Sequence, residues 1–545
     1  MTYQNAEEIA FPKLSDEVMH QVGELGTLET FENGQPLIEI GQKEYPFCLV
    51  VSGEVSIVDT TTGQTREVVT HGPGGFIGDV DILTGRPAVI SAIAKCKTQA
   101  YIINATKVRR LLNEIPDLSE LLLEAFQMRR RMLEASEFLG TRVIGTAQSK
   151  ETAKIREFFY KNHVPHTFFD VAEEEGHQQL CQLDATIEDV PVVACSGHVA
   201  KKPSIIKIAE CLGISREVET EPYDFVIVGA GPAGLAAAVY AASEGIKTLV
   251  IDSIGPGGQA GGSSKIENFI GFPSGLSGAE LANRGYLQAL KFGAQFTSPV
   301  SVKTIRQDEN GDHLLDLCTG QTARAKCVLA ATGVTYRQLD LEGCRRLEGA
   351  GVYYAATSVE ARVCRDSTAI IVGSGNSAGQ AAMFLADHAS HVKMLIRGDE
   401  LGKGMSSYLC NRILKHKGIE VIPNTEISGI NGDQYVESVL VRNNKTEAED
   451  QLDCTGVFIF IGARPHTDWL PESVRRDEKG FVLTGSAIHN DEFWTQDRTP
   501  CDLETTCPGI LAAGDVRSGT TKRCGFAVGD GSLAVTCVHR YLNQI

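Results

Sequence analysis

The amino-acid sequence predicts a multi-domain protein in which a β-barrel or jelly roll with a C-terminal helix precedes α/β domains of the Rossmann type. Three observations carry this prediction. The chain has 545 residues, which is too long for one hydrophobic core. Short β-like runs separated by glycine turns extend from about Phe11 to Ala105. Two glycine-rich motifs, each following a predicted buried strand, begin at Gly229 and Gly373.

Composition and charge exclude several classes of function. Hydrophobic residues make up 42% and charged residues 22%, with 55 glycines, which is typical of a globular protein with many tight turns. The formal net charge of −18 opposes nucleic-acid backbones and anionic membranes, so we expect neither as a partner. The basic cluster from Arg129 to Arg131 is interpreted as a solvated helix face. The apolar window from Phe225 to Ile246 contains glycines and a strand-like start, which indicates a buried strand, turn and helix.

The cysteines and the N-terminus indicate the compartment. No basic segment followed by an apolar run opens the chain, so we expect no secretory signal. The 15 cysteines are scattered without a CxxC pair, and reduced thiols are expected. We therefore expect a cytoplasmic protein, and we expect no metal site.

Changes of pattern along the chain predict where the domains begin and end. A helical stretch runs from Lys107 to about Glu137, and helices alternate with strands from about Ala147 to Ile214. The acidic stretch SREVETEPYD is the expected linker to the glycine-rich half. The expected domains are 1–140 for the barrel, 141–216 for a small α/β domain, 221–340 and 463–545 for the two parts of the first dinucleotide-binding domain, and 341–462 for the second, which is inserted in the first.

The first glycine motif has the context that a dinucleotide site requires. Gly229 permits a tight turn, Gly231 lets the backbone approach a pyrophosphate, and Gly234 lets the following helix pack closely on the strand. The N-terminus of that helix then faces the phosphates. Asp252, at the end of the next strand, can accept hydrogen bonds from a ribose diol.

The second glycine motif begins at Gly373, and the strand after it ends at Arg397 rather than at an acidic residue. A guanidinium pairs with a 2′-phosphate that a carboxylate would repel, so the sequence predicts NADP at this site. The alternative is that Arg397 only caps a strand end in solvent. Two such motifs imply two nucleotide domains, one inserted in the other.

The chain from Tyr223 to Ile545 resembles the low-molecular-weight thioredoxin reductases within the pyridine nucleotide–disulfide oxidoreductase class. The matching segments are VIVGAGPAGLAAAVYAA, GPGGQ, IENFIGFP, LAATG, VGSGNSAGQAA, FIGARP and TTCPGILAAGDV. The resemblance implies FAD at the first motif, a nicotinamide cofactor at the second, and a homodimer. The residues expected at FAD are Gly229, Gly231, Pro232, Ala233, Gly234, Asp252, Gly258, Gln259, Asn268, Thr332, Gly333, Gly514, Asp515 and Arg523, and those expected at NADP are Gly373, Gly375, Asn376, Ser377, Ala378 and Arg397.

The sequence departs from that family at the redox-active cysteines. The family has Cys-Ala-Thr-Cys before the second glycine motif, where this chain has Ala355 and Ser358 at the two thiol positions. A serine hydroxyl cannot replace a thiol in disulfide exchange. The candidate thiols that remain are Cys364, interpreted as a packed strand residue, and Cys524. Cys524 lies at an expected helix start near the flavin, where either a lowered pKa or a small buried residue is the interpretation.

The N-terminal region resembles a cyclic nucleotide-binding domain. FCLVVSGEVSIV matches the strand–turn–strand of that family, and GGFIGDVDILTGRPAVISAIA occupies its phosphate-binding cassette. The resemblance makes Gly78, Asp79 and Arg86 the candidate ligands. Asp79 replaces the glutamate of the family and is shorter by one methylene, and Arg86 precedes a proline instead of following one. We therefore expect weak or absent binding of a cyclic nucleotide.

The region from Ile144 to Ile214 resembles a glutaredoxin or thioredoxin fold. KIREFFYKNHVPHTFFDV matches the first helix and second strand, and Val190-Pro191-Val192 matches the cis-proline turn. No cysteine occupies the expected start of that helix. We interpret the region as a redox-inactive adaptor that contacts an electron acceptor.

Three functions stay open from the sequence. The first is an NADPH-dependent flavoprotein oxidoreductase that passes electrons from FAD directly to an unknown acceptor, such as a redox protein, a quinone or oxygen. The second is a thioredoxin-disulfide reductase that works through non-standard cysteines. The third is a non-catalytic flavin sensor whose redox state is reported to a partner.

Overall fold

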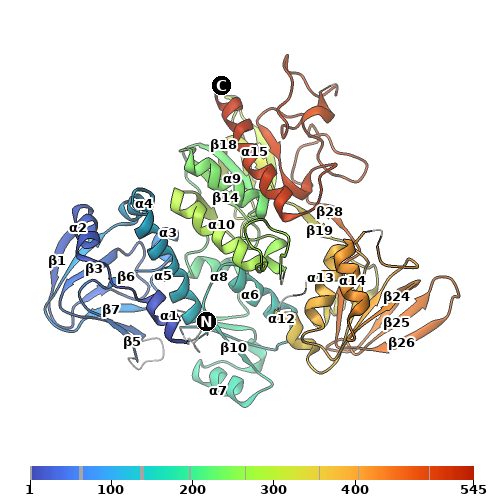
Figure 1. The fold of residues 1–545 in the computed structure, drawn as a ribbon, viewed down its shortest axis with the longest axis horizontal. Helices are drawn as coiled ribbons and strands as arrows, with labels where there is room; N and C mark the ends of the chain where they lie inside the picture. Colours follow the sequence, from blue (N-terminus) through green and yellow to red (C-terminus); the bar gives the residue numbers. More distant parts are fainter. Residues whose placement is uncertain are drawn as a thin grey trace.

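The computed structural model describes residues 3–59, 66–135, 140–195, 198–263, 265–354, 356, 358–402, 404–489 and 491–544. Figure 1 shows the strands of the N-terminal region on one side, a central group of helices including α9 and α10, and the inserted strands β24, β25 and β26 on the opposite side. The C-terminal helix α15 returns to lie against α9 in the centre.

Two antiparallel four-stranded sheets form the front domain, in the orders β1-β8-β3-β6 and β2-β7-β4-β5. The stacked rings of Phe47 and Phe76 lie in the core, which confirms the expected jelly roll. Helices α1 (Tyr3–Ala10) and α2 (Asp16–Leu25) precede the sheets. The strands are β1 (Thr27–Phe31), β2 (Pro36–Ile38), β3 (Phe47–Ser52), β4 (Val55–Asp59), β5 (Arg66–His71), β6 (Phe76–Ile77), β7 (Ser91–Ala94) and β8 (Thr98–Ile103).

The helical stretch that was predicted from Lys107 to about Glu137 is two helices instead of one. Helix α4 (Ala105–Glu114) has Ile115 as its C-cap, and α5 (Pro116–Ala135) starts at the proline. Proline disfavours helical geometry in the residue before it and has no N–H to continue the helix, so it breaks the first helix and begins the second. Glu137 lies outside the described residues.

The basic cluster on α5 corrects the sequence interpretation, because Arg129 and Arg130 are buried. Arg129 donates hydrogen bonds to the carbonyls of Ala10, Gly78 and Phe76. Arg130 pairs with the partly buried carboxylate of Asp79 at 3.1 Å and with the buried carboxylate of Asp81 at 2.6 Å. A buried guanidinium is stable only where acceptors surround it, and α5 lies against the loop that supplies them. The side chain of Arg131 remains half-exposed.

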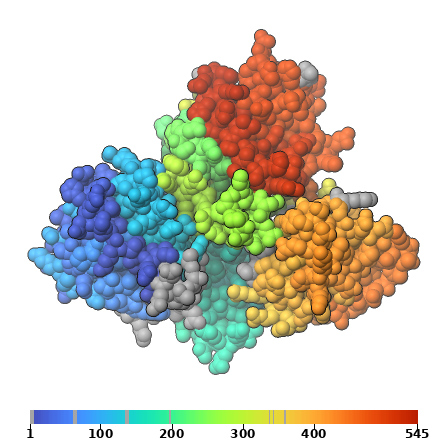
Figure 2. Space-filling model, in the orientation of Figure 1, coloured from blue at the N-terminus to red at the C-terminus, as the bar shows by residue number. Residues whose placement is uncertain are grey.

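A small α/β unit follows, with a sheet of order β10-β9-β11-β12 in which β9 and β10 are parallel and the other pairs antiparallel. The Val190–Pro191 peptide is cis, as the sequence predicted. In Figure 2 this unit, coloured teal, lies between the blue front domain and the orange inserted strands and helices. Its elements are β9 (Thr141–Gly145), α6 (Lys150–Lys161), β10 (Thr167–Asp170), α7 (Glu174–Gln182), β11 (Val192–Cys195), β12 (His198–Lys201) and α8 (Ile205–Cys211).

The first glycine motif belongs to a sheet of order β15-β14-β13-β18-β17-β16, with β29 also paired to β18. Strands β13, β14, β15, β18 and β29 run parallel, and β16 and β17 add an antiparallel edge. The window from Phe225 to Ile246 is a buried strand, a turn and a helix, as predicted. The elements are β13 (Tyr223–Val228), α9 (Pro232–Ser243), β14 (Thr248–Ile251), α10 (Gly278–Phe292), β15 (Gln295–Thr297), β16 (Val302–Gln307), β17 (His313–Leu317), β18 (Thr322–Ala330), β29 (Ile510–Ala512) and α15 (Cys524–Leu542).

The second glycine motif belongs to a separate parallel sheet of order β20-β27-β21-β22-β23, joined to a three-stranded antiparallel sheet. The strand pair β19 and β28 lies where the chain enters and leaves this unit. The elements are β19 (Val334–Tyr336), α11 (Glu342–Arg346), β20 (Val352–Tyr353), α12 (Ser358–Ala361), β21 (Thr368–Val372), α13 (Asn376–Leu385), β22 (His391–Leu395), α14 (Ser407–Lys415), β23 (Ile419–Ile422), β24 (Thr425–Asn431), β25 (Ser438–Asn443), β26 (Glu449–Asp453), β27 (Gly456–Ile459) and β28 (Ala463–Pro465).

The front domain packs directly against the unit of the first glycine motif. Its hydrophobic core continues into α9 and α10 through Leu235, Tyr286 and Leu290. The side-chain amide of Asn113 on α4 also donates to the carbonyl of Lys291 at 3.3 Å. In the described parts of the chain, no helix is both long and apolar enough to span a bilayer.

We predict that Arg130→Ala destabilises the front domain locally by about 3–5 kcal/mol, because it removes the cation that pairs with the buried carboxylate of Asp81 and the partly buried carboxylate of Asp79. Hydrogen exchange of the amides in β6 and in the short helix α3 (Asp81–Thr84) measures the free energy of local opening. The neighbouring change Arg131→Ala is the matched control, with an expected effect below about 1 kcal/mol. Equal protection of these amides from exchange in the two variants would contradict a stabilising role of the ion pairs of Arg130.

Candidate functional site

Close backbone contacts build the turn between β13 and α9. Gly229 has φ of +109°, and a Cβ atom there would collide with the carbonyl of Ala331. A Cβ atom at Gly234 would collide with the carbonyl of Gly229 itself. These two positions therefore require glycine, as the sequence predicted.

The face of the turn that a dinucleotide would contact is open. A Cβ atom at Gly231 would meet only the Cα atom of Gly258, at 3.9 Å. Gly231 is the N-cap of α9 and provides no capping side chain, so within the described residues no N-cap side chain competes with an anion for the first N–H groups of that helix. The residues present thus fit a pyrophosphate at this helix terminus.

Asp252 at the end of β14 organises the loop that follows it. Its Oδ1 accepts from the N–H groups of Ile254 at 2.9 Å and Gly255 at 2.8 Å, and its Oδ2 accepts from the N–H of Ala230 at 2.8 Å. A carboxylate oxygen has two lone pairs, so Oδ2 keeps the capacity to accept one ribose hydroxyl. Asp252 therefore both fixes its own loop and fits the expected ribose contact.

The C-terminal segment reaches the same helix terminus. A Cβ atom at Gly514 would lie 3.0 Å from the Cβ of Ala233, and the N–H of Gly514 donates to Asp530 on α15 at 2.9 Å. Asp515 follows directly, and burial, reinforced by Asp530, raises the pKa of its carboxyl group although Lys522 opposes the shift. Asp515 is thereby placed beside the first turn of α9.

Two further polar contacts join the remaining segments. The side-chain amide of Gln259 donates to the carbonyl of Val334, next to Gly333, and the hydroxyl of Thr332 donates to the carbonyl of His466 at 2.7 Å. The side chains of Asn268 and Arg523 are exposed, and neither makes a side-chain hydrogen bond or ion pair with another described residue. The structure therefore brings together most of the expected FAD residues and leaves these two at the surface.

The second glycine motif repeats the same construction. Gly373 has φ of +135°, and a Cβ atom there would collide with the carbonyl of Phe460. Gly375 is the N-cap of α13 and provides no capping side chain. The Oδ1 atom of Asn376 accepts from the N–H of Ser406 at 2.8 Å and from its hydroxyl at 3.0 Å, so this side chain fixes a neighbouring loop. Ser377 is exposed and Ala378 is buried.

Arg397 follows β22 and its side chain is exposed. Its carbonyl accepts from the side-chain amide of Asn444 at 3.0 Å, which holds the backbone. The nearby carboxylate of Asp399 pairs with Lys445. The guanidinium of Arg397 has no partner in the described part of the chain, so its charge is available to an anion.

The thiol candidates are poorly suited to disulfide exchange. Ala355 lies outside the described residues, and Ser358 begins α12. Cys364 is completely buried, and burial raises the pKa of its thiol to about 11. The possibility of a lowered pKa at Cys524 is wrong, because burial and the nearby carboxylate of Asp515 raise it.

Two other cysteine pairs were missed by sequence reasoning. Cys501 and Cys537 form a disulfide, so the expectation of reduced thiols is wrong for them. Their Cα atoms lie 5.9 Å apart because α15 packs against the loop at Cys501. The Sγ atoms of Cys195 and Cys211 lie 3.3 Å apart in the small α/β unit. Wide sequence separation, 36 residues for the first pair and 16 for the second, leaves no motif by which to recognise them.

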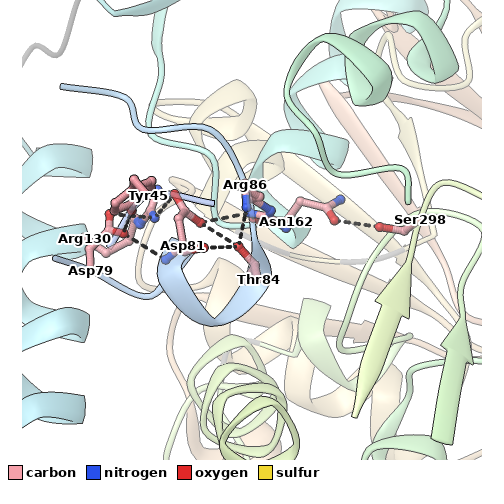
Figure 3. A network of polar contacts seen from close by, with 8 residues as sticks. All are labelled: Tyr45, Asp79, Asp81, Thr84, Arg86, Arg130, Asn162 and Ser298. Atoms are coloured by element: carbon pink, nitrogen blue, oxygen red, sulfur yellow. Dashed lines mark hydrogen bonds and ion pairs between the residues drawn. The ribbon is translucent and has the colours of Figure 1, made fainter. Parts of the chain in front are cut away.

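The candidate cyclic-nucleotide ligands have partners within the protein (Figure 3). Asp79 accepts from the hydroxyl of Tyr45 at 2.5 Å and pairs with Arg130. Arg86 donates to the backbone carbonyl of Asn162 at 2.7 Å, outside the front domain. Gly78 has φ of +145°, and its carbonyl accepts from Arg129 at 2.7 Å. The cassette is thus connected to its own chain at each candidate position.

Comparison with known proteins agrees with this geometry. The chain matches the family model described as Pyridine nucleotide-disulphide oxidoreductase over residues 223–531, and the model described as Cyclic nucleotide-binding domain over residues 28–114. It is 33% identical over 329 residues to the thioredoxin reductase of Treponema pallidum (strain Nichols), with 60% of this chain and 99% of that protein covered. It is 31% identical over 324 residues to a 34.2 kDa protein in the rubredoxin operon of Clostridium pasteurianum, with 59% and 98% covered.

Solved structures show the same similarity. Thioredoxin reductase from Lactococcus lactis in the FR conformation is 28% identical with a TM-score of 0.53, and the alignment covers 59% of this chain and all of that one. Thioredoxin reductase from T. acidophilum is 29% identical with a TM-score of 0.53, and the alignment covers 59% and 99%. Because the first family model matches more than half of the sequence, this chain belongs to the pyridine nucleotide-disulphide oxidoreductase family, as a thioredoxin reductase-like enzyme with an N-terminal cyclic nucleotide-binding domain.

Proposed function

We propose that this chain is an NADPH-dependent flavoprotein oxidoreductase that transfers electrons from FAD directly to an external acceptor. The observation that carries the proposal is the convergence of separate segments on the N-terminus of α9. The turn at Gly229, the loop after Asp252, the segment at Thr332 and the C-terminal Asp515 all lie there. The first glycine motif then serves FAD and the second serves the nicotinamide cofactor.

The residues around α9 would hold FAD through its phosphates and hydroxyls. The free N–H groups at Gly231 and the helix terminus would bind the pyrophosphate, and Asp252 Oδ2 would accept from a ribose hydroxyl. Gln259 keeps the loop near Gly258 attached to the strand that begins at Val334. When bound, FAD supplies the capacity to accept a hydride and pass its electrons on.

The residues of the inserted unit would hold NADPH. Gly375 opens the first turn of α13 for the pyrophosphate, and Arg397 provides an unpaired guanidinium for the 2′-phosphate. The bond from Asn444 to the carbonyl of Arg397 fixes the backbone from which that side chain extends.

Direct transfer from the flavin is favoured over transfer through thiols. Disulfide exchange needs a thiolate to attack and a second thiol to resolve the mixed species. Cys364 lies in the hydrophobic core of the inserted unit, whereas Cys524 begins α15. The Cys501–Cys537 disulfide lies about 20 Å along α15 from Cys524, from the helical rise per residue.

We also assign the domains that the sequence predicted: residues 1–140, 141–216, 221–340 with 463–545, and 341–462. Separate hydrophobic clusters support the division of the last three of these domains from one another. Phe158 belongs to the cluster of the small α/β unit, Phe225 to that of the first glycine motif and Phe458 to that of the second.

We predict that NADPH bleaches the visible flavin absorbance of the holoprotein under anaerobic conditions, and does so more efficiently than NADH. Arg397→Ala should lower the efficiency with NADPH by about 1–3 kcal/mol, roughly 5- to 150-fold, and leave NADH nearly unchanged. Stopped-flow spectroscopy measures both rates, with Arg345→Ala on α11 as the control. Absence of bleaching by either cofactor would refute the proposed function, and equal losses for both would refute the role of Arg397.

The protein should not reduce thioredoxin or a small aromatic disulfide at rates typical of its relatives, because neither family thiol position holds a cysteine. NADPH oxidation coupled to disulfide reduction tests this in the wild type and in the Cys364→Ser, Cys524→Ser double variant. Turnover in the wild type that survives the double change would contradict both direct transfer from the flavin and a reductase that works through Cys364 and Cys524. Turnover that disappears would instead establish the reductase with non-standard cysteines.

We expect cyclic AMP and cyclic GMP to bind weakly or not at all. A cyclic phosphate must displace the carbonyl of Asn162 from Arg86, and a ribose hydroxyl must compete with Tyr45 and Arg130 for Asp79. Isothermal titration calorimetry on the full chain measures the affinity. A micromolar or tighter Kd for either nucleotide would show that these internal contacts yield to the ligand.

A further inference from the structure

Asn162 connects three parts of the chain at one buried point (Figure 3). It caps the C-terminus of α6 in the small α/β unit and is only 1% exposed. Its backbone carbonyl accepts from Arg86 of the front domain at 2.7 Å. Its side-chain Nδ2 donates to the carbonyl of Ile254 at 2.7 Å, and its Oδ1 accepts from the hydroxyl of Ser298 at 2.9 Å. Ile254 and Ser298 both belong to the unit of the first glycine motif.

The bond to Ile254 acts on the segment from Asp252 to Gly258, which we name the flavin loop. Asp252 holds the N–H of Ile254, and Asn162 holds its carbonyl, so this residue is fixed from both sides. The fit is close at the next residue, because a Cβ atom at Gly255 would lie 2.5 Å from Asn162 Nδ2. The flavin loop therefore packs closely around the side chain of Asn162, which belongs to another domain.

The surroundings leave little room for Asn162 to move. The Nδ2 atom also donates to the carbonyl of Phe158 at 2.9 Å, within its own helix. A cavity of about 20 Å³ lies beside it between Arg86 and Asp252, which is space for a single water molecule. A displacement of the Asn162 side chain would therefore also displace the flavin loop to which it is hydrogen-bonded.

Arg86 fixes Asn162 from the front domain. It is 8% exposed, and its Nη1 lies 4.0 Å from the carboxylate of Asp81, which also pairs with Arg130. The neighbouring His163 carries no competing charge, because burial, together with Arg86, lowers the pKa of its imidazole to about 3. The arginine of the cassette is thus used as a clamp between domains.

We infer that Asn162 is a positioning residue for the flavin loop, and that Arg86 holds Asn162 in place. The front domain and the small α/β unit together then set the affinity of the chain for FAD. This inference rests on the proposed function, since it takes FAD to be the occupant of the first glycine motif. Neither residue touches the reacting atoms. Their effect is on the geometry of Asp252 and the backbone that follows it.

The test measures FAD affinity on apoprotein by flavin fluorescence, not activity. Asn162→Ala removes the donor to Ile254, and we expect the Kd for FAD to rise about tenfold. Asn113→Ala is the matched control: its amide also donates to a carbonyl of the same unit, that of Lys291, but away from the flavin loop. Its Kd should equal that of the wild type.

A second pair of variants tests Arg86. We expect Arg86→Ala to weaken FAD binding in the same direction as Asn162→Ala, and Arg109→Ala to leave it unchanged, because Arg109 donates to the carbonyl of Leu83 within the front domain. Gly231→Val, which fills the pyrophosphate site, provides the reference for full loss of FAD. Circular dichroism of each apoprotein separates misfolding from loss of affinity.

The outcomes separate the inference from the proposed function. If wild-type apoprotein fails to bind FAD, the proposed function is refuted. If the wild type binds FAD and folded Asn162→Ala binds it equally well, the inference is overturned while the function stands. Equal weakening by Asn162→Ala and Asn113→Ala would also overturn it, since general domain docking would then explain the effect. An unchanged Kd in Arg86→Ala would overturn the role of Arg86.

Discussion

The approach of backbone to backbone around the N-terminus of α9 is the constraint on which the cofactor site depends. Gly229 and Gly234 let the strand, turn and helix meet at distances that a Cβ atom would prevent. The same contacts place Ala331 and Gly514 against the turn, so residues far apart in sequence arrive at one helix terminus. Asp252 then fixes the following loop, because its carboxylate accepts from the backbone N–H groups of Ile254 and Gly255 in that loop and of Ala230 in the glycine turn. The backbone contacts thus set the geometry of the site, and the side chain of Asp252 adds hydrogen bonds to it.

In the front domain, ion pairs between buried charged side chains fix the geometry of the loop. The carboxylate of Asp79 is partly buried and that of Asp81 is buried, and burial together with repulsion from Asp81 raises the pKa of Asp79. Burial acts in the same direction on Asp81, but Arg130 and Arg86 outweigh it and lower its pKa. The two arginines thus stabilise the charged form of Asp81, and Arg86 also donates to the carbonyl of Asn162.

The sequence was sufficient where short-range rules decide the structure. The glycine motifs, the jelly roll and the buried strand at Phe225 follow from local pattern, the cis peptide before Pro191 follows from the resemblance to a thioredoxin fold, and the structure has each of them. It was insufficient where a partner comes from elsewhere in the chain. The burial of Arg130, the Cys501–Cys537 disulfide and the raised pKa at Cys524 all depend on groups that only the fold brings near. Asn162 had no local signature for the same reason.

The small α/β unit packs against the chain just before the family thiol positions. The ammonium of Lys150, at the start of α6, pairs with Glu348 at 2.8 Å, and its Cα lies 3.4 Å from the Cβ position of Gly349. These residues directly precede β20 and the two family thiol positions that follow it, Ala355 and Ser358. A disulfide substrate must bring its sulfur atoms to exposed thiols, and here a covalently attached domain packs against the residues that precede that segment. The loss of the cysteines and the packing of this domain beside Glu348 and Gly349 are consistent with each other, since a segment without thiols does not need an open approach for a disulfide.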